Sequence, residues 1–224
     1  AKTDYEQYVE LYSGIPWEDL ANGVRALMEE NPGTLRDFCW IAFQTKHVDH
    51  FLKDILPLFL GQLAIRPELT GAEQDILDAI ALSGIAEDFV QYGLMPLLPA
   101  VRDPAELKIA TERVLELTQE TGADAPYVLR WGLARFDRLI GSLADLDEVA
   151  GKMESIAREG KPYGNRFLFK WGFESFDEFI ETKKAIDDHA AGLIRLARST
   201  GKRWQGFITI SLPKFNTHFV SGFI

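Results

Sequence analysis

The sequence predicts an all-α protein, an α-solenoid of helical-hairpin repeats with a period of about 40 residues and a short β-like C-terminal tail. Three observations predict this fold. The segment "RWGLARFDRLI" from Arg130 returns as "KWGFESFDEFI" from Lys170. Within each copy, glycine, phenylalanine and isoleucine stand four positions apart, as residues on one face of a helix do. Helix-capping residues then divide each copy into two helices.

The similarity between the two copies extends well beyond the tryptophan segments. Residues 131–160 align with 171–200, and each unit closes near a glycine, Gly160 or Gly201. A fainter copy begins at Tyr92 and closes on Gly122. The identical pairs are Trp131/Trp171, Gly132/Gly172, Phe136/Phe176, Asp137/Asp177, Ile140/Ile180, Asp147/Asp187, Ala150/Ala190, Ala157/Ala197 and Arg158/Arg198.

The glycine that follows each tryptophan predicts a close helix crossing. Gly132, Phe136 and Ile140 share one helical stripe. Glycine in a helix costs up to about 1 kcal/mol relative to alanine. That cost is tolerable where the missing Cβ lets a neighbouring helix approach, so we expect this stripe to be a packing seam.

Capping patterns place the helices within each unit. Asp103 with Glu106, Asp145 with Glu148, and Thr70 with Glu73 each predict a helix start, and Thr182 predicts a further one. Thr34 with Asp37 predicts an earlier start. The expected helices cover residues 4–12, 17–30, 35–46, 48–65, 71–82, 86–98, 104–121, 125–141, 146–159, 166–180 and 183–200.

The C-terminal residues change period. "GFITISL" from Gly206 alternates β-branched and other residues, which favours a strand. We therefore expect one helical domain over 1–205 and a β-hairpin or extended arm over 206–224. Such an arm could cap the last unit, pair with a second copy in a homo-oligomer, or pair with a strand elsewhere.

Composition limits the classes of partner and compartment. The formal charge is −10 and the pI is near 4.9, which argues against duplex nucleic acid and anionic membranes. The same charge suits a basic protein or peptide, and it also promotes solubility. Cys39 is the only cysteine, so neither an internal disulfide nor a thiolate cluster can form. With no apolar run of bilayer length and no signal-peptide pattern in "AKTDYEQY", we expect a cytoplasmic protein.

One cluster carries residues that could perform chemistry. His47, Asp49 and His50 lie within "KHVDHFLKD". Two histidines and one carboxylate are too few for a metal site, which needs several ligands converging on one point. The phosphate-binding loops, the nucleophile elbow and the zinc-protease motif do not occur. We therefore expect no cofactor and no catalytic residue, with these three side chains as the only metal candidates.

Polar residues that recur in each unit are the candidates for binding. Arg130 and Lys170 each precede a tryptophan, and Asp137 and Asp177 recur beside the seam. A polar residue repeated on the same helix of stacked units lines one face, where ligands dock. The same residues could instead form structural ion pairs. Arg203 and Trp204 follow Gly201 and are the further candidates for an exposed contact.

The units resemble the HEAT and armadillo class of two-helix repeats over about 92–201, and more loosely over 35–91. The resemblance implies a curved right-handed stack whose inner helices face a ligand, most often a protein. HEAT-like proteins that bind DNA show a basic channel, which this acidic chain does not suggest.

These observations favour a non-enzymatic protein-interaction module, an acidic helical-repeat scaffold that binds a basic protein or peptide, in an inhibitor or immunity-type role. Two alternatives stay open. One is an all-helical enzyme with a buried pocket around His47, Asp49 and His50. The other is a structural or assembly subunit that uses residues 206–224.

Overall fold

Three helices of 18 residues each dominate the structure, a computed structural model that describes residues 50–212. They are α8 (Pro104–Thr121), α10 (Leu143–Gly160) and α12 (Lys183–Thr200). A side-chain oxygen caps the start of each: Asp103, Ser142 and Thr182 accept the backbone N–H three residues ahead. Such a cap satisfies a donor that the helix leaves free. The predicted all-α class is confirmed for the described residues, which contain no strand.

Shorter helices alternate with these three. They begin as α7 (Ala86–Asp88), α9 (Ala125–Trp131), α11 (Asn165–Phe167) and α13 (Trp204–Gly206). Each continues in π- or 3-10-helical turns. After α7 come η3 (Phe89–Leu94) and η4 (Met95–Ala100), and after α9 comes η6 (Leu133–Leu139). After α11 come η8 (Leu168–Phe173) and η9 (Asp177–Phe179), and after α13 comes η11 (Phe207–Ser211).

Two further helices precede this set. A π-helical turn, η1 (Phe51–Ile55), leads into α5 (Leu56–Ala64), and a 3-10 turn, η2 (Pro67–Leu69), connects it to α6 (Glu73–Ser83). The remaining 3-10 turns, η5 (Gly122–Asp124), η7 (Lys161–Tyr163) and η10 (Gly201–Arg203), follow the three long helices. None of the helices between residues 50 and 212 has the length and apolar character needed to cross a membrane.

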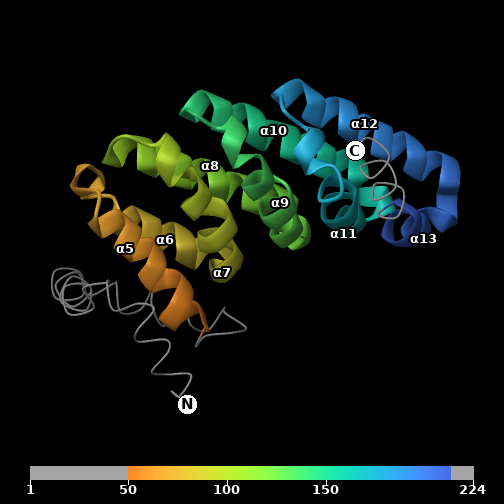
Figure 1. Ribbon diagram of the computed structural model, residues 1–224. Helices are drawn as coiled ribbons and strands as arrows, with labels where there is room; N and C mark the ends of the chain where they lie inside the picture. The colour runs from red at the N-terminus through yellow and green to blue at the C-terminus, as the bar shows by residue number, and fades with distance from the viewer. Residues whose placement is uncertain (1–49, 213–224) are drawn as a thin grey trace, which may run out of the picture.

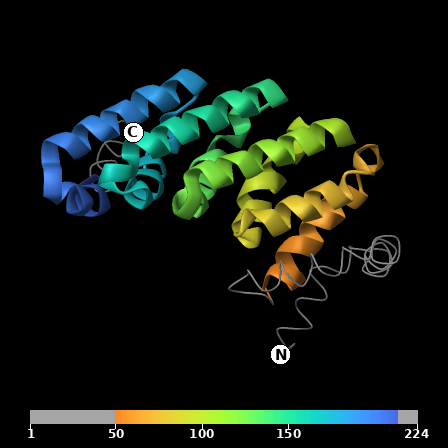
Figure 2. The same ribbon diagram turned by 180° about the vertical axis from the view of Figure 1, so that it is seen from behind.

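The helices lie in two rows. Figures 1 and 2 show α8, α10 and α12 side by side, which we call the long row, with α6 packed against α8. The short helices α7, α9, α11 and α13, with their continuations, follow one another along the flank of the long row, and we call them the short row. One hydrophobic cluster runs between the rows from Phe51 to Leu212. It crosses the boundary predicted between residues 205 and 206.

The glycines after the aromatic residues make the close crossings that the sequence predicts. A Cβ on Gly93 would lie 2.8 Å from Val114, one on Gly132 would lie 2.8 Å from Met153, and one on Gly172 would lie 2.6 Å from Leu193. A real Cβ essentially never lies this close to another heavy atom, so each long helix packs closely against a glycine of the short row. The three glycines, and the three side chains facing them, occupy aligned positions of the sequence.

The strand predicted within the C-terminal segment is wrong for the residues described. Phe207–Ser211 is helical, while residues 213–224 lie outside the described part. The alternation of "FITIS" suggested a strand, but Trp204, Ile208 and Leu212 stand four apart and are all buried. That spacing is a helical stripe, and packing it against the core outweighs the β propensity of the isoleucines and threonine.

Two predicted caps also differ from the structure. Asp145 is not the cap of α10 but its third residue, and its carboxylate accepts the hydroxyl of the true cap, Ser142. Thr70 does not cap α6, which starts after Ala72 with no side-chain cap. Instead the Glu73 carboxylate accepts the backbone N–H of Gly71. In both cases an acid near the helix start satisfies a free N–H from inside the helix.

Candidate interaction surfaces

Cations and aromatic rings alternate along the short row. The Arg130 guanidinium lies over Tyr92, 4.9 Å from the ring centroid, and over Trp131 at 5.0 Å. The Lys170 ammonium lies 5.3 Å from the Trp131 centroid and 5.0 Å from that of Trp171. We call these five side chains the cation–aromatic stack. It joins η3, α9 and η8, so it brings together two of the binding residues predicted from sequence, Arg130 and Lys170.

The stack is partly open to solvent. Arg130 is exposed, and Tyr92, Trp131, Lys170 and Trp171 are half-buried. Burial raises the pKa of the Tyr92 hydroxyl above its ordinary value, while the nearby Arg130 charge opposes that rise. Each cation–ring contact contributes about 0.5–1 kcal/mol at an exposed site, so the stack fixes the cations in place without neutralising them. Within residues 50–212, neither cation forms an ion pair with a carboxylate.

The long row carries a different arrangement, in which ion pairs link neighbouring helices. Lys108 of α8 pairs with Asp75 of α6 at 2.9 Å. Arg113 of α8 pairs with Asp147 of α10 at 2.9 Å, and Lys152 of α10 pairs with Asp187 of α12 at 2.5 Å. We call these three pairs the ion-pair ladder.

The last two steps of the ladder use the same two aligned positions, and Lys108 of the first step aligns with Asp147. Arg113 and Lys152 occupy one aligned position, and Asp147 and Asp187 the other, while the step from α6 to α8 has the signs exchanged. A second contact links α10 and α12, where Lys183 pairs with Asp145 at 2.6 Å. Hydrogen bonds from the Lys183 ammonium and, with a smaller effect, from the Ser142 hydroxyl lower the pKa of Asp145 to about 2.

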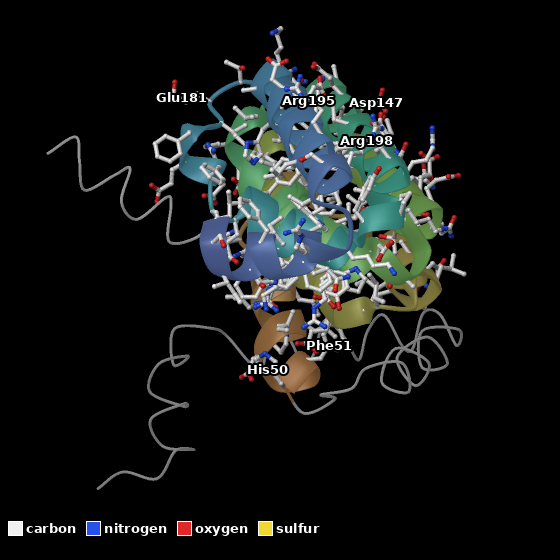
Figure 3. The ribbon with its side chains drawn as sticks, turned by 90° about the vertical axis from the view of Figure 1, so that its right-hand side faces the viewer. His50, Phe51, Asp147, Glu181, Arg195 and Arg198 are labelled. Atoms are coloured by element: carbon white, nitrogen blue, oxygen red, sulfur yellow. The ribbon has the colours of Figure 1, made fainter. Side chains whose placement is uncertain are left out.

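Negative charge collects on three helices. The acids exceed the bases by three in α6, by two in α8 and by three in α10, which accounts for eight of the ten net negative charges. Glu112, Glu120 and Glu159 are exposed, and within the described residues none of them has an ion-pair partner. Helix α12 differs, since its bases exceed its acids by two. Figure 3 shows two of those bases, Arg195 and Arg198, on the same side of the molecule as Asp147 of α10.

The two aspartates predicted as binding residues have different environments. Asp177 accepts from Arg135 at 3.2 Å, while the Arg138 guanidinium donates to the backbone carbonyls of Asp177 and Ile180. Asp177 therefore belongs to a contact between α9–η6 and η9. Asp137 is exposed, and among residues 50–212 its carboxylate accepts only the backbone N–H of Arg138. The structure does not bring either aspartate into the cation–aromatic stack.

The two remaining predicted binding residues, Arg203 and Trp204, differ in their exposure to solvent. Trp204 is 2% exposed, so its proposed role as an exposed contact is wrong. It is the first residue of the buried stripe of α13, and its burial follows from the helical spacing to Ile208 and Leu212. Arg203 is exposed, with no ion-pair partner in the described part of the chain. Trp204 and Lys202 line a surface hollow with Tyr163.

Only one member of the histidine cluster can be described. His47 and Asp49 lie outside the described residues, and His50 is exposed and hydrogen-bonds Asp54 at 2.5 Å. Figure 3 shows His50 at the α5 end, away from the labelled residues of α10 and α12. Between residues 50 and 212, no group of three histidine, cysteine or acidic side chains is placed to hold a metal ion.

Two further polar side chains are enclosed by the helices, Asn165 buried and His189 half-buried. Asn165 is 2% exposed and donates to the Asp124 carboxylate and to the Ala157 carbonyl, both at 2.8 Å. It lies beside a polar cavity of about 110 Å³ between the ends of α8 and α10. His189, the second, hydrogen-bonds the Gly172 carbonyl at 3.1 Å. Its aligned position in the preceding unit, Val149, is apolar, so periodicity gave no signal for a histidine there.

No protein-family model, curated protein or solved structure matches this chain.

Proposed function

We propose that the chain is a protein-interaction module built on an α-solenoid scaffold, and that it binds a basic protein or peptide through the acidic surface of α6, α8 and α10. The solenoid is supported by the spacing of the helices. The long helices begin at residues 104, 143 and 183, and the short ones at 86, 125, 165 and 204. These steps of 39 or 40 residues coincide with the alignment in the sequence.

The repeated seam is the second support for the scaffold. Each glycine of the short row meets a long helix and also the following short helix, since Leu129, Phe169 and Ile208 approach Gly93, Gly132 and Gly172 in turn. A unit thus contacts the next one in the same way each time, which is how solenoids extend. A stacked array of this kind presents broad surfaces rather than one deep active site.

The distribution of charge carries the functional part of the proposal. Eight net negative charges lie on three neighbouring helices, and several of their carboxylates are exposed without a cation. A cationic partner would gain from this field in its rate of association and in its selectivity. An inhibitor or immunity-type role and a cytoplasmic setting are part of the same proposal, and they rest on the size and composition of the chain.

The test measures binding of a fluorescently labelled lysine-rich peptide by anisotropy. Glu120→Gln with Glu159→Gln removes two exposed charges at aligned positions of α8 and α10. Glu178→Gln with Glu181→Gln removes two exposed charges elsewhere and is the matched control. We expect the first variant to weaken binding several-fold and the control to change it less, since neither glutamate of the control lies on α6, α8 or α10.

Salt dependence and an unbiased search complete this test. Affinity for the lysine-rich peptide should fall as salt is raised, and a native-lysate pull-down at low and high salt should recover a basic protein. If the peptide binds the unmodified protein and both variants equally well, or if its binding does not respond to salt, the acidic surface is not the binding site.

A further inference from the structure

The cation–aromatic stack lies on the short row, which is distinct from the acidic helices, and its two cations are held close together. Arg130 and Lys170 both approach the Trp131 ring, at 5.0 and 5.3 Å from its centroid. The guanidinium carbon and the ammonium nitrogen are therefore no more than about 10 Å apart, because their separation cannot exceed the sum of these two distances. Two like charges at this separation repel each other, and no carboxylate within residues 50–212 pairs with either.

The hydrogen-bond donors of Arg130 are available to a ligand. Its side chain is exposed, and among residues 50–212 no protein acceptor forms a hydrogen bond with its fork of N–H groups. Those donors match the two oxygens of a carboxylate, and charge-assisted pairs of this kind are stronger than neutral hydrogen bonds. The Lys170 ammonium, which contacts the same Trp131 ring, adds three further donors.

From this arrangement we infer that the stack is a docking site for an acidic peptide segment, with one carboxylate held by Arg130 and another by Lys170. The aromatic rings hold the cations in position and offer apolar edges to the rest of the segment. Trp, Tyr and Arg are the side chains that most often dominate the binding energy of protein interfaces. The inference does not depend on the function proposed for the acidic surface, because that surface would bind a basic partner rather than an acidic one.

The ring contacts favour a peptide over single-stranded nucleic acid. Proteins that bind single strands stack bases on the faces of aromatic side chains. Here cations lie over Tyr92, Trp131 and Trp171, and Tyr127 stacks on Trp131 with the ring centroids 5.7 Å apart. A base that stacked on those ring faces would have to displace these contacts. A net charge of −10 also repels a continuous phosphate backbone more than it repels a short peptide.

Anisotropy of a short fluorescein-labelled peptide of alternating glutamate and glycine tests the inference, and a labelled oligothymidylate and a lysine–glycine peptide serve as comparison probes. Two changes, Arg130→Gln and Lys170→Gln, are made separately and together. Arg203→Gln removes an exposed arginine of η10 that lies over no ring of the described residues, so it is the matched control for charge. Arg130→Lys keeps the charge but removes the forked donors.

We expect the glutamate peptide to bind the unmodified protein in a salt-sensitive manner. Each single charge loss should weaken binding about tenfold, as the loss of one charge-assisted hydrogen bond does. Arg130→Lys should recover only part of the affinity, and Arg203→Gln should leave it unchanged. Circular dichroism confirms that each variant is folded, and the Glu120/Glu159 variant should bind this peptide at least as well as the unmodified protein.

Three results would overturn the inference. They are tighter binding of oligothymidylate than of the glutamate peptide, equal weakening by Arg203→Gln and Arg130→Gln, and no detectable binding of the glutamate peptide at low salt. Failure of the acidic-surface test with success here, or the reverse, separates this inference from the proposed function.

Discussion

His189 shows, at the level of one residue, how the fold changes the pKa of a side chain. Its ring lies among Phe173 and Phe176, with centroid distances of 5.3 and 5.2 Å, and one ring nitrogen hydrogen-bonds the Gly172 carbonyl. Burial lowers the pKa of His189 because the charged imidazolium loses its hydration, and the hydrogen bond to the carbonyl offsets part of that effect. The neutral ring with its N–H on Gly172 is thus the form that the folded protein prefers.

The lowered pKa predicts a loss of stability in mild acid. The unfolded chain takes up a proton on His189 near its ordinary pKa of about 6.5, whereas the folded chain does so only at lower pH. The free energy of unfolding should therefore be fully maintained above about pH 6.5 and should fall as pH drops through the window between the two pKa values. Urea unfolding of the unmodified protein and of His189→Gln, at pH about 7.5 and about 5, measures this.

Glutamine keeps a donor for the Gly172 carbonyl but does not titrate, so the variant isolates the charge. Every other ionisable group is the same in both proteins, so its contribution cancels in the difference between them. We expect the stability of the unmodified protein relative to His189→Gln to decrease on acidification. A constant difference across that pH range would show that the site accepts imidazolium without penalty.

Two arginines show which residue-scale contacts could not be read from the sequence. Arg66 donates to the carbonyls of Leu98 and Val101, and Arg138 donates to those of Asp177 and Ile180. The carbonyl pairs occupy aligned positions, each at the end of a short-row segment. The arginines themselves do not occupy aligned positions, because Arg66 comes from the turn before α6 and Arg138 from η6. Periodicity therefore reveals the acceptors but not the donors.

At the scale of elements, helices with a side-chain cap and a clear stripe were predictable. The ranges predicted for α8 and α12 agree with the structure, as do the caps Asp103 and Thr182. The ends of the short-row segments were less predictable because their backbone changes between π, α and 3-10 turns, which propensity does not encode. The C-terminal segment was misread because β-branched residues mask a helical stripe when the stripe has only three members.

Some residues of the candidate surfaces could also be predicted from the sequence repeat. A basic residue before each tryptophan predicted that Arg130 and Lys170 line one face as binding residues, and in the structure both cations contact the Trp131 ring. The ion-pair ladder could have been found in the same way, since Arg113 aligns with Lys152 and Asp147 with Asp187. Trp204 could not be placed correctly while the segment after it was taken for a strand.

The glycine seam makes a prediction about how the two rows pack. Gly132 has φ −108° and ψ −84°, and a Cβ there would run into the Val128 carbonyl oxygen and lie 2.8 Å from the Met153 sulfur. Gly132→Ala should therefore force the row of short helices away from α10, with a loss of about 1–3 kcal/mol in the free energy of unfolding, as overpacking typically causes. Chemical denaturation followed by circular dichroism measures the change.

Gly192 supplies the matched control for this substitution. It lies inside α12, its φ is not positive, and nothing lies within 4 Å of the position a Cβ would take. Gly192→Ala should stabilise the protein by up to about 1 kcal/mol, because alanine favours the helix. If the two alanine variants changed stability equally, the seam would not depend on the absent Cβ.

At the scale of the whole molecule, the acidic surface and the stacked cations lie on different helices. The acidic exposed surface lies on α6, α8 and α10, while the short row holds two stacked cations without carboxylate partners in the described chain. The charge pattern also changes along the array. The ion-pair ladder ends at α12, where Gly192 occupies the position aligned with Arg113 and Lys152, so α12 lacks the cation that would reach a further long helix.

The proposed scaffold predicts that one whole unit can be removed. Deleting residues 125–164 joins Asp124 to Asn165, so that α11 follows η5 where α9 did. Phe169 would then take the place of Leu129 against Gly93, and Asp187 the place of Asp147 opposite Arg113, because both replacements come from aligned positions. In an array whose units contact only their neighbours, the shortened chain should keep its helical content per residue and unfold cooperatively, although less stably.

Deleting only residues 125–142 is the control. It removes one short-row segment and joins one long helix directly to the next, so this shorter deletion should abolish cooperative unfolding. Circular dichroism and thermal melts compare the two deletions, and equal disruption by both would mean that these helices form a single interdependent core rather than a stack of units.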